Sequence, residues 1–436
     1  MDTTLEYYEI YPKVMLAGRV TAVTIRPLGG HAAFSRDEEY EITVLPMKET
    51  LEPDEGHELL PYSKYAWVKP TFGDGGSLTF SFLFAREQEY YVRLYKKSDV
   101  KRKGGVQFRV YAVDADLYER RPYRGDLHLH STWSDGKESP EIVMASYRKA
   151  GFDFTGLTDH MRLGASLAAI EAYRDAAADL CMCRGEEVHL PGNHVHIVNF
   201  AADESVQAYA ESDMDRFNAE VGEIAEGCDI PDGVSRFEYA ACLWIFRQIK
   251  RAGGISIFPH PCWKSNVYHV PEAMTDALFA SGEFDAFELL GGVAPDDNNM
   301  QAAYYNEARI KGQNINVVGS SDSHGQINTD YFNWYKTVLF AKELTPEGIR
   351  EAVKSGYSVA VEQYRDENAR VHGPYRLVGF TLFLLSEYFP IHDEMCFEEG
   401  RQMKEYTLGE PSAAEILKLL SGRTRRYLEK MYKGDK

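Results

Sequence analysis

Histidine and carboxylate side chains recur at the ends of predicted strands along the chain. Of the thirteen histidines, six lie at or just past such strand ends: His128, His130, His160, His196, His260 and His324. Acidic residues accompany them, namely Asp126, Asp135, Asp159, Glu186, Glu187 and Asp322. Imidazole and carboxylate groups together suit zinc, manganese or iron. The pattern predicts a metal site, and roughly nine to eleven such ligands would serve three ions.

The spacing of these residues places several of them on common faces. His128 and His130 are two apart on a short predicted strand, so both imidazoles face one side, about 7 Å apart along the strand. Asp135 returns on a tight turn, and Asp322 and His324 repeat the two-residue spacing. An isolated pair of this kind is usually incidental. So many polar groups at successive strand ends would be costly to bury unless they coordinate something.

The elements that carry these residues alternate between strand and helix. After the strand that carries GDLHLHS, a helix is expected from the Ser139 cap to about Ala150. Strands are then expected at 152–160, 180–188, 194–200, 255–260, 284–290, 315–322 and 337–341. Helices fit at 166–179, 205–226, 237–252, 271–281, 299–312 and 345–355. This order indicates an α/β barrel or a doubly wound sheet, and in barrels the strand ends carry the chemistry.

The two ends of the chain follow other patterns. Alternating segments at 20–28, 40–47, 77–85, 89–97 and 106–114 predict an N-terminal β-sandwich over residues 1–120. The α/β region then covers 121–362, and a C-terminal extension covers 363–436. Within this extension, 375–385 reads as a strand or a buried helix, and 411–431 as an amphipathic helix.

The ordered motifs resemble those of the PHP (polymerase and histidinol phosphatase) superfamily. They are RGDLHLHSTWSDG, GLTDH, Gly185-Glu186-Glu187, HVHIVNF, FPHP and GSSDSHG, and they extend from residue 124 to about 361. The N-terminal β region, GDLHLHSTWSDG and TPEGIREAVKSGYSVAV look most like the carbaryl-hydrolase-like (CehA/McbA) branch. The resemblance implies a distorted seven-stranded β/α barrel with a trinuclear metal site at its C-terminal mouth.

The resemblance also implies which residues hold the ions. One ion would be held by His128, His130, Glu187 and Asp322, a second by Glu187, His196 and His260, and a third by Asp135, His160 and His324. The family turn Gly-x-Glu selects Glu187, although Glu186 stands beside it. His194 and His189 are spare histidines. Asp126 and Asp159 are expected to orient the ligands and strand ends rather than to bind metal.

A metal site of this kind predicts hydrolysis, and the resemblance implies a small phosphate ester as the substrate. Metal ions lower the pKa of a bridging water and clamp a tetrahedral centre. Arg162, Lys264 and Ser265 are candidate substrate donors, and Trp133 and Trp263 could stack on a planar group. Two alternatives stay open, a carboxylic or carbamate ester hydrolase at the same site and a non-catalytic metal-binding scaffold. No Gly-rich phosphate loop, GxSxG elbow or GxGxxG turn stands at a strand-to-helix junction.

Composition limits the partners of the protein. The 436 residues include 67 acidic and 48 basic side chains, a net charge of −19, which disfavours a nucleic acid polymer or an anionic membrane. An exonuclease would need a basic groove with stacking aromatics, and the sequence has no such stripe. Six cysteines without tandem CxxC spacing predict free thiols. Without a signal peptide or an apolar run near 18 residues, a soluble cytoplasmic protein is expected.

Overall fold

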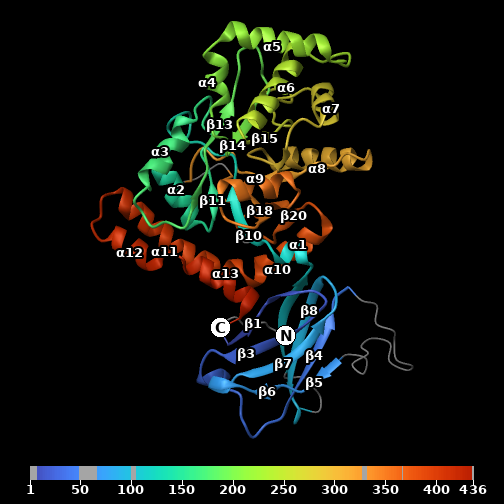
Figure 1. Ribbon diagram of the computed structural model, residues 1–436, viewed down its shortest axis with the longest axis vertical. Helices are drawn as coiled ribbons and strands as arrows, with labels where there is room; N and C mark the ends of the chain where they lie inside the picture. Colours follow the sequence, from blue (N-terminus) through green and yellow to red (C-terminus); the bar gives the residue numbers. More distant parts are fainter. Residues whose placement is uncertain (1–6, 49–65, 100–104, 327–330, 366, 435–436) are drawn as a thin grey trace. The chain divides into compact units, whose positions relative to one another are not determined.

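The computed structural model describes residues 7–48, 66–99, 105–326, 331–365 and 367–434. The chain has a mixed α/β fold and divides into two compact units. Unit 1 comprises Met1–Arg121, Gly379–Pro390 and Gly422–Lys436, and unit 2 comprises Pro122–Val378 and Ile391–Ser421. Figure 1 shows the strands of unit 1 in blue and cyan and those of unit 2 from cyan to orange.

Unit 1 contains two sheets. The first is antiparallel, in the order β1 (Tyr8–Tyr11), β3 (Arg19–Pro27), β7 (Leu78–Phe84) and β6 (Thr71–Phe72). The second has the order β2 (Val14–Leu16), β9 (Val106–Val113), β8 (Gln88–Lys96), β4 (Tyr40–Pro46) and β5 (Ala66–Val68). The five predicted N-terminal strands are confirmed as β3, β4, β7, β8 and β9. Buried side chains of both sheets, such as Val23, Phe80, Ile42 and Val92, form one hydrophobic cluster.

Unit 2 also contains two sheets. One has the order β12 (Cys181–Met182), β11 (Phe154–Thr155), β10 (Arg121–Asp126), β18 (Tyr335–Ala341), β19 (Ser358–Glu362) and β20 (Arg370–His372). The other has the order β13 (Gly185–Val188), β14 (Ile197–Phe200), β15 (Ile255–Phe258), β16 (Ala286–Leu290) and β17 (Val317–Gly319). β14 is antiparallel to both of its neighbours, whereas β15, β16 and β17 are parallel.

Several predicted strands are shorter or divided. The strand predicted at GDLHLHS ends at Asp126, before His128, and the strand predicted over 315–322 is only Val317–Gly319. The segment 180–188 forms β12 and β13 in different sheets, and of 152–160 only Phe154–Thr155 is strand. Gly156 marks the point where the chain leaves β11, because a Cβ there would lie 2.5 Å from the Cys183 carbonyl oxygen. Such an approach requires glycine, and the backbone then continues as a loop to His160.

The two sheets of unit 2 are linked at the ends of their strands. Isolated bridges pair Leu129 with Ser323 and His160 with Glu187. The Asp322 N–H donates to the His128 carbonyl oxygen at 2.8 Å. No sheet closes into a barrel within the described ranges, so the expected closed form of the barrel is not found. These links nevertheless gather the strand ends that carry the histidines.

The helices of unit 2 follow the predicted order. They are α2 (Pro140–Lys149), α3 (Gly164–Ala172), α4 (Val206–Glu211), α5 (Met214–Gly227), α6 (Arg236–Arg251), α7 (Glu272–Ser281), α8 (Pro295–Ile310) and α9 (Pro346–Lys354). The helix predicted over 205–226 is two helices, because the Asp213 side chain accepts the Arg216 N–H at 3.0 Å and caps α5. Figure 1 shows α4, α5 and α6 in green beyond β13 and β14. Their buried faces share one cluster with β14 to β16.

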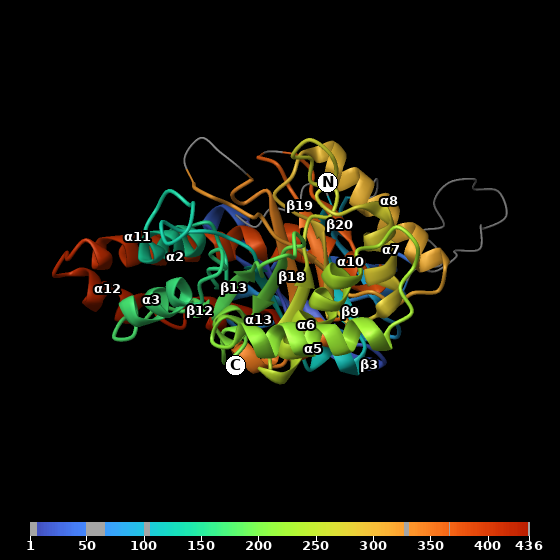
Figure 2. The same cartoon turned by 90° about the horizontal axis from the view of Figure 1, so that it is seen from above.

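Beyond β20, the described part of the C-terminal region is helical apart from its turns. It consists of α10 (Tyr375–Glu387), α11 (Phe389–Thr407), α12 (Ala413–Leu420) and α13 (Arg423–Lys433). The helix alternative for 375–385 is confirmed. The single helix predicted over 411–431 is interrupted at Gly422, whose φ of +75° ends α12. In Figure 2, α11 lies beside α2, where Glu399 accepts a hydrogen bond from the Arg148 guanidinium at 2.7 Å.

All six cysteines are free thiols. Within the part of the chain that the structure describes, every helix is too short or too polar to cross a membrane.

Candidate metal centre

The structure brings all nine predicted ligands together at one end of unit 2. His128 and His130 follow β10, and Asp135 follows them on a turn. Glu187 lies in β13. The others lie next to strands: His160 after β11, His196 before β14, His260 after β15, and Asp322 and His324 after β17. Each of the nine has a nitrogen–oxygen contact within 4.0 Å of another member. Residues nearly 200 positions apart in the sequence thus share one site.

Glu187 occupies the middle of this cluster and is 1% exposed. Its Oε1 lies 2.9 Å from His196 Nδ1 and 3.4 Å from His260 Nε2. Its Oε2 lies 2.7 Å from His160 Nδ1 and 3.4 Å from His128 Nε2. Burial alone would raise the pKa of Glu187, but the nearby imidazoles outweigh it and hold the pKa well below its usual range. A carboxylate whose two oxygens face different histidines is arranged to bridge two ions.

Glu186 lies on the opposite face of β13, as the two-residue period of a strand requires. Its carboxylate accepts hydrogen bonds from Asn199 Nδ2 at 2.9 Å, from the Ser205 hydroxyl at 2.5 Å and from the Val206 N–H at 2.6 Å. These donors belong to β14 and to the start of α4. The structure therefore separates the two neighbouring glutamates, with Glu187 in the cluster and Glu186 at a helix N-terminus.

A second carboxylate joins the histidines at the more open side of the cluster. Asp135 Oδ2 lies 3.3 Å from His160 Nε2 and 3.3 Å from His324 Nε2. Together with His130, these residues form a group spaced as metal ligands are. Burial opposes ionisation of Asp135, but the two imidazoles outweigh it and keep its pKa well below the usual range. The carboxylate is thus ionised and available to a cation.

The buried side of the cluster is built around His128. Asp322 Oδ1 lies 3.3 Å from His128 Nε2 and 2.9 Å from His130 Nε2. On the other side of the ring, Glu288 Oε2 lies 2.9 Å from His128 Nδ1. Glu288 was not among the predicted site residues, although it is the lone acid in the otherwise apolar segment AFELL. Asp322 and His260 have φ values of +47° and +28°, a conformation that costs energy in residues other than glycine.

Two further histidines border the cluster. The His269 ring lies 4.2 Å from that of His196, and His196, His260 and His269 form another group with metal-ligand spacing. His269, which stands in the loop after FPHP, was not among the predicted site residues. His189 Nε2 lies 3.2 Å from His160 Nδ1. His194, the other spare histidine, has an 86% exposed side chain and pairs with Glu238 at 2.8 Å, away from the cluster.

The imidazoles differ in their protonation. Burial lowers the pKa of His196 to about 4 and that of His269 to about 3. Burial opposes the charged form of His160 too, but Asp135 and Glu187 outweigh it and raise its pKa to about 10. His196 and His269 are therefore neutral at pH 7, the form in which imidazole binds metal.

Asp126 and Asp159 contact the backbone that carries the ligands. Asp126 Oδ1 accepts the Ser321 N–H at 3.0 Å and the His128 N–H at 3.2 Å. Burial raises the pKa of Asp126 to about 7. Asp159 accepts hydrogen bonds from the Ser131 N–H at 3.0 Å and the Ser134 hydroxyl at 2.8 Å. Both carboxylates thus fix the segments on which the candidate ligands stand.

The predicted substrate residues lie around the exposed rim. Lys264 Nζ pairs with Asp296 at 3.0 Å and also contacts Asp297, so two acids offset its charge. Arg162 is exposed, and the described residues offer its guanidinium no hydrogen bond or ion pair. Ser265 is exposed on the loop of Lys264. The side chains of Trp133 and Trp263 are 43% and 39% exposed, and the Trp263 ring centre lies 5.9 Å from that of His260.

The buried polar atoms of the cluster provide a test of whether metal ions fit. Six of them are buried without a hydrogen-bond partner among the described residues: His128 Nε2, Glu187 Oε1, Glu187 Oε2, His260 Nδ1, His269 Nε2 and Glu288 Oε1. Buried polar atoms of folded proteins nearly always have a partner. Divalent cations would satisfy ionised carboxylates and neutral imidazoles in this arrangement, so the residues fit the metals that the resemblance implies.

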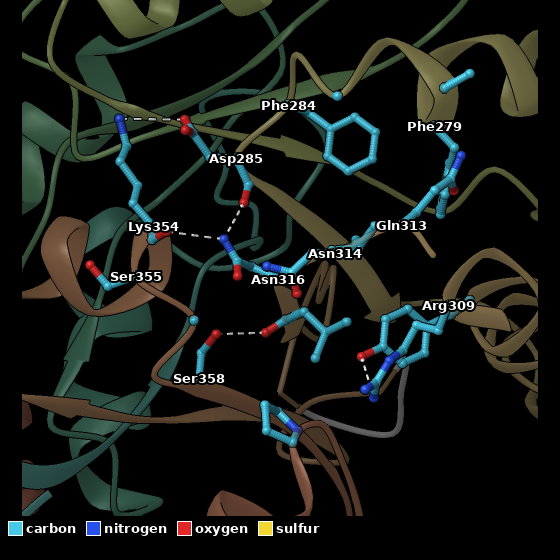
Figure 3. A pocket seen from close by; sticks show the side chains of 17 residues that line it. Phe279, Phe284, Asp285, Arg309, Gln313, Asn314, Asn316, Lys354, Ser355 and Ser358 are labelled. Atoms are coloured by element: carbon cyan, nitrogen blue, oxygen red, sulfur yellow. Dashed lines mark hydrogen bonds and ion pairs between the residues drawn. The ribbon is translucent and has the colours of Figure 1, made fainter. Parts of the chain in front are cut away.

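A separate cavity of about 670 Å³ lies at the other ends of the same strands. Asp285 precedes β16 and Asn316 precedes β17 (Figure 3). Lys354 pairs with Asp285 at 3.4 Å, and Asn316 Nδ2 donates to the Asp285 carbonyl oxygen at 3.0 Å. None of the nine candidate ligands lines this cavity. Its polar groups largely join the strand starts to α9.

Comparisons with known proteins give short or distant similarities. No family model matches the chain. Among curated proteins, the DNA polymerase/3'-5' exonuclease PolX of Bacillus subtilis (strain 168) is 37% identical over 59 residues, 14% of this chain. The matched region covers only 10% of that relative's length.

Two solved structures are similar over about half of the chain. One is a two-domain protein containing a predicted PHP-like metal-dependent phosphoesterase from Bacteroides vulgatus, with 20% identity, a TM-score of 0.40 and coverage of 56% of this chain and 65% of that one. The other is an amidohydrolase from Chromobacterium violaceum with bound sulfate and no metal, with 20% identity, a TM-score of 0.34 and coverage of 56% and 99%.

Proposed function

We propose that unit 2 is a metal-dependent hydrolase of a small phosphate ester. The observation that carries the proposal is Glu187, a buried carboxylate whose two oxygens face separate histidines and lack hydrogen bonds from the described residues. Structural histidines and acids normally satisfy one another inside a protein. The short match to an exonuclease, which also cleaves phosphate esters, supports the same reaction class.

The ligand sets follow the arrangement of the side chains. His128, His130, Glu187 and Asp322 would hold one ion, Glu187, His196 and His260 a second, and Asp135, His160 and His324 a third. Zinc, manganese and iron all suit these donors. Such ions, when bound, would supply an activated water and neutralise the charge of the phosphate.

The remaining residues prepare the site. Glu288 orients the His128 ring through Nδ1, and Asp126 and Asp159 hold the backbone at His128 and Ser131. The exposed Arg162 can bind a phosphate oxygen, since no described residue engages its guanidinium. Lys264 and Ser265 remain further candidates for this task, although Asp296 and Asp297 already engage the lysine.

We also propose the finer architecture that the resemblance implies. Residues 1–120 would form an accessory β-sandwich, since the two sheets share one buried cluster. Residues 121–362 would form a distorted barrel of the PHP type, held together at its mouth by the isolated bridges instead of continuous sheet pairing. Residues 363–436 would be an extension, and the CehA/McbA branch would be the nearest relatives.

The net charge of −19 agrees with a small substrate better than with a polymer. Asp135, Glu187 and Asp322 contribute three negative charges, which three divalent ions would exceed. The metal-loaded site would then be a positive spot on an acidic protein, which a small anionic ester can reach without running along the surface. A cytoplasmic location, a reducing compartment, is part of this proposal.

The test begins with metal analysis of the purified full-length protein. The protein is then assayed with Mn²⁺, Zn²⁺ or Fe²⁺ on p-nitrophenyl phosphate and p-nitrophenyl acetate, alongside His128→Ala and the exposed control His194→Ala. We expect phosphate hydrolysis that His128→Ala abolishes and His194→Ala preserves. Preference for the acetate would instead favour the carboxylic or carbamate ester hydrolase. Absence of bound metal, or activity unchanged in His128→Ala, would overturn the proposal and favour a scaffold.

A further inference from the structure

We propose that His269 is an additional ligand of the ion held by Glu187, His196 and His260. This inference rests on the metal centre of the proposed function and extends it, because His269 stands outside the nine residues that the family motifs identify. The ion at this position would then be held by three imidazoles and one carboxylate oxygen. Neither of the other two ligand sets contains more than two imidazoles.

The positions of the side chains support this ligand set. One nitrogen from each of His196, His260 and His269 lies within 4.8 Å of the others, a spacing that one cation can fill. Glu187 Oε1 lies beside the same group, at 2.9 Å from His196 Nδ1 and 3.4 Å from His260 Nε2. Glu187 thus contacts two of the three histidines that could share one cation.

His269 has an atom free to serve as a ligand. Its Nε2 is buried, and no described residue forms a hydrogen bond with it. A histidine that served only to pack the loop would usually satisfy both ring nitrogens. This unpartnered nitrogen, on a residue that shares metal-ligand spacing with His196 and His260, points to a missing cation.

The loop that carries His269 is built to return to the cluster. The Trp263 N–H donates to the His260 carbonyl oxygen at 3.1 Å, and the His269 N–H donates to the Trp263 carbonyl oxygen at 2.7 Å. The Val270 N–H donates to the Pro261 carbonyl oxygen at 3.1 Å, which closes the loop at its base. His260 and His269 therefore stand at the two ends of one hydrogen-bonded loop, and the loop fixes their separation.

The composition of this ligand set predicts which ion it prefers. Imidazole nitrogen suits zinc, whereas carboxylate and water suit manganese. Three imidazoles are a common ligand set for zinc, and the Glu187 oxygen would supply a fourth ligand. Of the three sets, this one should bind Zn²⁺ most tightly and release it last to a chelator.

The experiment measures zinc binding rather than catalysis. Full-length protein stripped by a chelator is titrated with Zn²⁺ against a chromogenic competitor, for the parent, His269→Gln, His196→Gln and the exposed control His194→Gln. We expect both His269→Gln and His196→Gln to weaken the tightest site roughly tenfold or more, and His194→Gln to match the parent. The parent and His269→Gln are also loaded with Co²⁺ in place of Zn²⁺. The visible absorption bands of the two cobalt proteins should differ, since the variant has one nitrogen ligand fewer.

The outcomes separate this inference from the proposed function. If the parent binds no Zn²⁺, the metal centre fails and the role of His269 fails with it. If the parent binds and only His196→Gln weakens the site, the metal centre stands and His269 is not a ligand. Should His269→Gln fail to fold, anomalous diffraction from zinc-loaded parent crystals decides the point. A zinc peak about 2.1 Å from a His269 ring nitrogen supports the inference, and one beyond contact distance overturns it.

Discussion

Glu288 Oε2 lies 2.9 Å from His128 Nδ1, and both side chains are fully buried. The pair joins β16 to the segment that follows β10. With its Nδ1 proton directed to Glu288, the His128 ring presents Nε2 to Glu187 and Asp322. A carboxylate behind a ligating histidine fixes its tautomer and makes it a better metal ligand.

Replacement of Glu288 should therefore weaken metal binding without altering any ligand. We expect Glu288→Gln to lower the affinity of the site about 10- to 100-fold, because an amide can donate to Nδ1 and favour the wrong tautomer. Competition titration with Zn²⁺ measures the effect, and circular dichroism monitors the fold. Glu283→Gln is the control, since Glu283 pairs with Arg247 and not with a histidine. Equal affinities in the two variants would remove the positioning role.

The same substitution should have different effects at the two neighbouring glutamates of β13: loss of bound metal at Glu187 and loss of stability at Glu186. Glu187→Gln removes the central carboxylate, and we expect metal analysis to show loss of bound ions. Glu186→Gln leaves the cluster intact but replaces one carboxylate oxygen by an NH2 donor. Either the Val206 N–H, which donates to Oε1, or the Ser205 hydroxyl, which donates to Oε2, then loses its acceptor, so the free energy of unfolding should fall by about 1 to 3 kcal/mol. Urea titration measures that loss. Reduced metal content in Glu186→Gln alone would reverse the assignment.

The site residues that could be predicted are those marked by short sequence patterns. His128 and His130, like Asp322 and His324, share a two-residue spacing that marks them in the sequence, although the structure places the two pairs in the segments that follow β10 and β17 and not within strands. Glu288 and His269 lack such signals. Their roles arise because β16 pairs beside β17 and because the loop from His260 folds back, and both relationships depend on pairing across many residues.

In the fold, too, local sequence patterns predicted the type of an element, whereas its bounds and burial depend on other parts of the chain. The helix predicted over 205–226 has the correct periodicity, yet capping by Asp213 divides it, and Gly422 likewise divides the last predicted helix. α11 was not predicted because its sequence mixes acids with buried side chains such as His392 and Glu399. Those residues are buried through ion pairs with β11 and α2, which periodicity of apolar residues cannot reveal.

The buried His392 should make the stability of the protein depend on pH. His392 Nε2 lies 2.7 Å from Asp153 Oδ1. Burial opposes the charged imidazole, but Asp153 outweighs it and raises the pKa of His392 well above its usual value. The folded state thus binds the proton more tightly, so this stabilisation is complete below about pH 6.5 and falls as the pH rises through the folded pKa.

We expect His392→Gln to lower the free energy of unfolding by about 3 to 5 kcal/mol at pH 6, because it leaves buried Asp153 without this partner. The difference from the parent should shrink steadily toward pH 9. Urea titrations at pH 6, 7, 8 and 9 measure the trend, and the exposed His194→Gln serves as the matched control. A difference that stays constant across this range contradicts a charged His392.

Lys336 should show the opposite dependence on pH. It lies in β18, 3% exposed, and donates to Asn333 Oδ1 at 2.9 Å. Burial, followed by the nearby Arg124 charge, lowers the pKa of Lys336 to about 7. Between pH 7 and 10.5 the unfolded chain therefore binds one proton more than the folded protein. The burial of Lys336 lowers the free energy of unfolding by its full amount below pH 7, and this cost disappears as the pH rises toward 10.5.

Substitution by a neutral side chain of similar length should remove that cost. A fall from 10.5 to about 7 corresponds to roughly 5 kcal/mol, and the lost Asn333 contact offsets part of it, so Lys336→Met should be on the order of 3 kcal/mol more stable at pH 7. The advantage should shrink steadily as the pH rises and be nearly gone at pH 10, where the parent lysine is neutral in the folded state and has begun to lose its proton in the unfolded chain. Urea unfolding of both proteins from pH 6 to pH 10 measures the two curves. Parallel curves would mean that Lys336 keeps its charge in the folded protein, with Asp393 and Asp126 as the nearby acids that could sustain it.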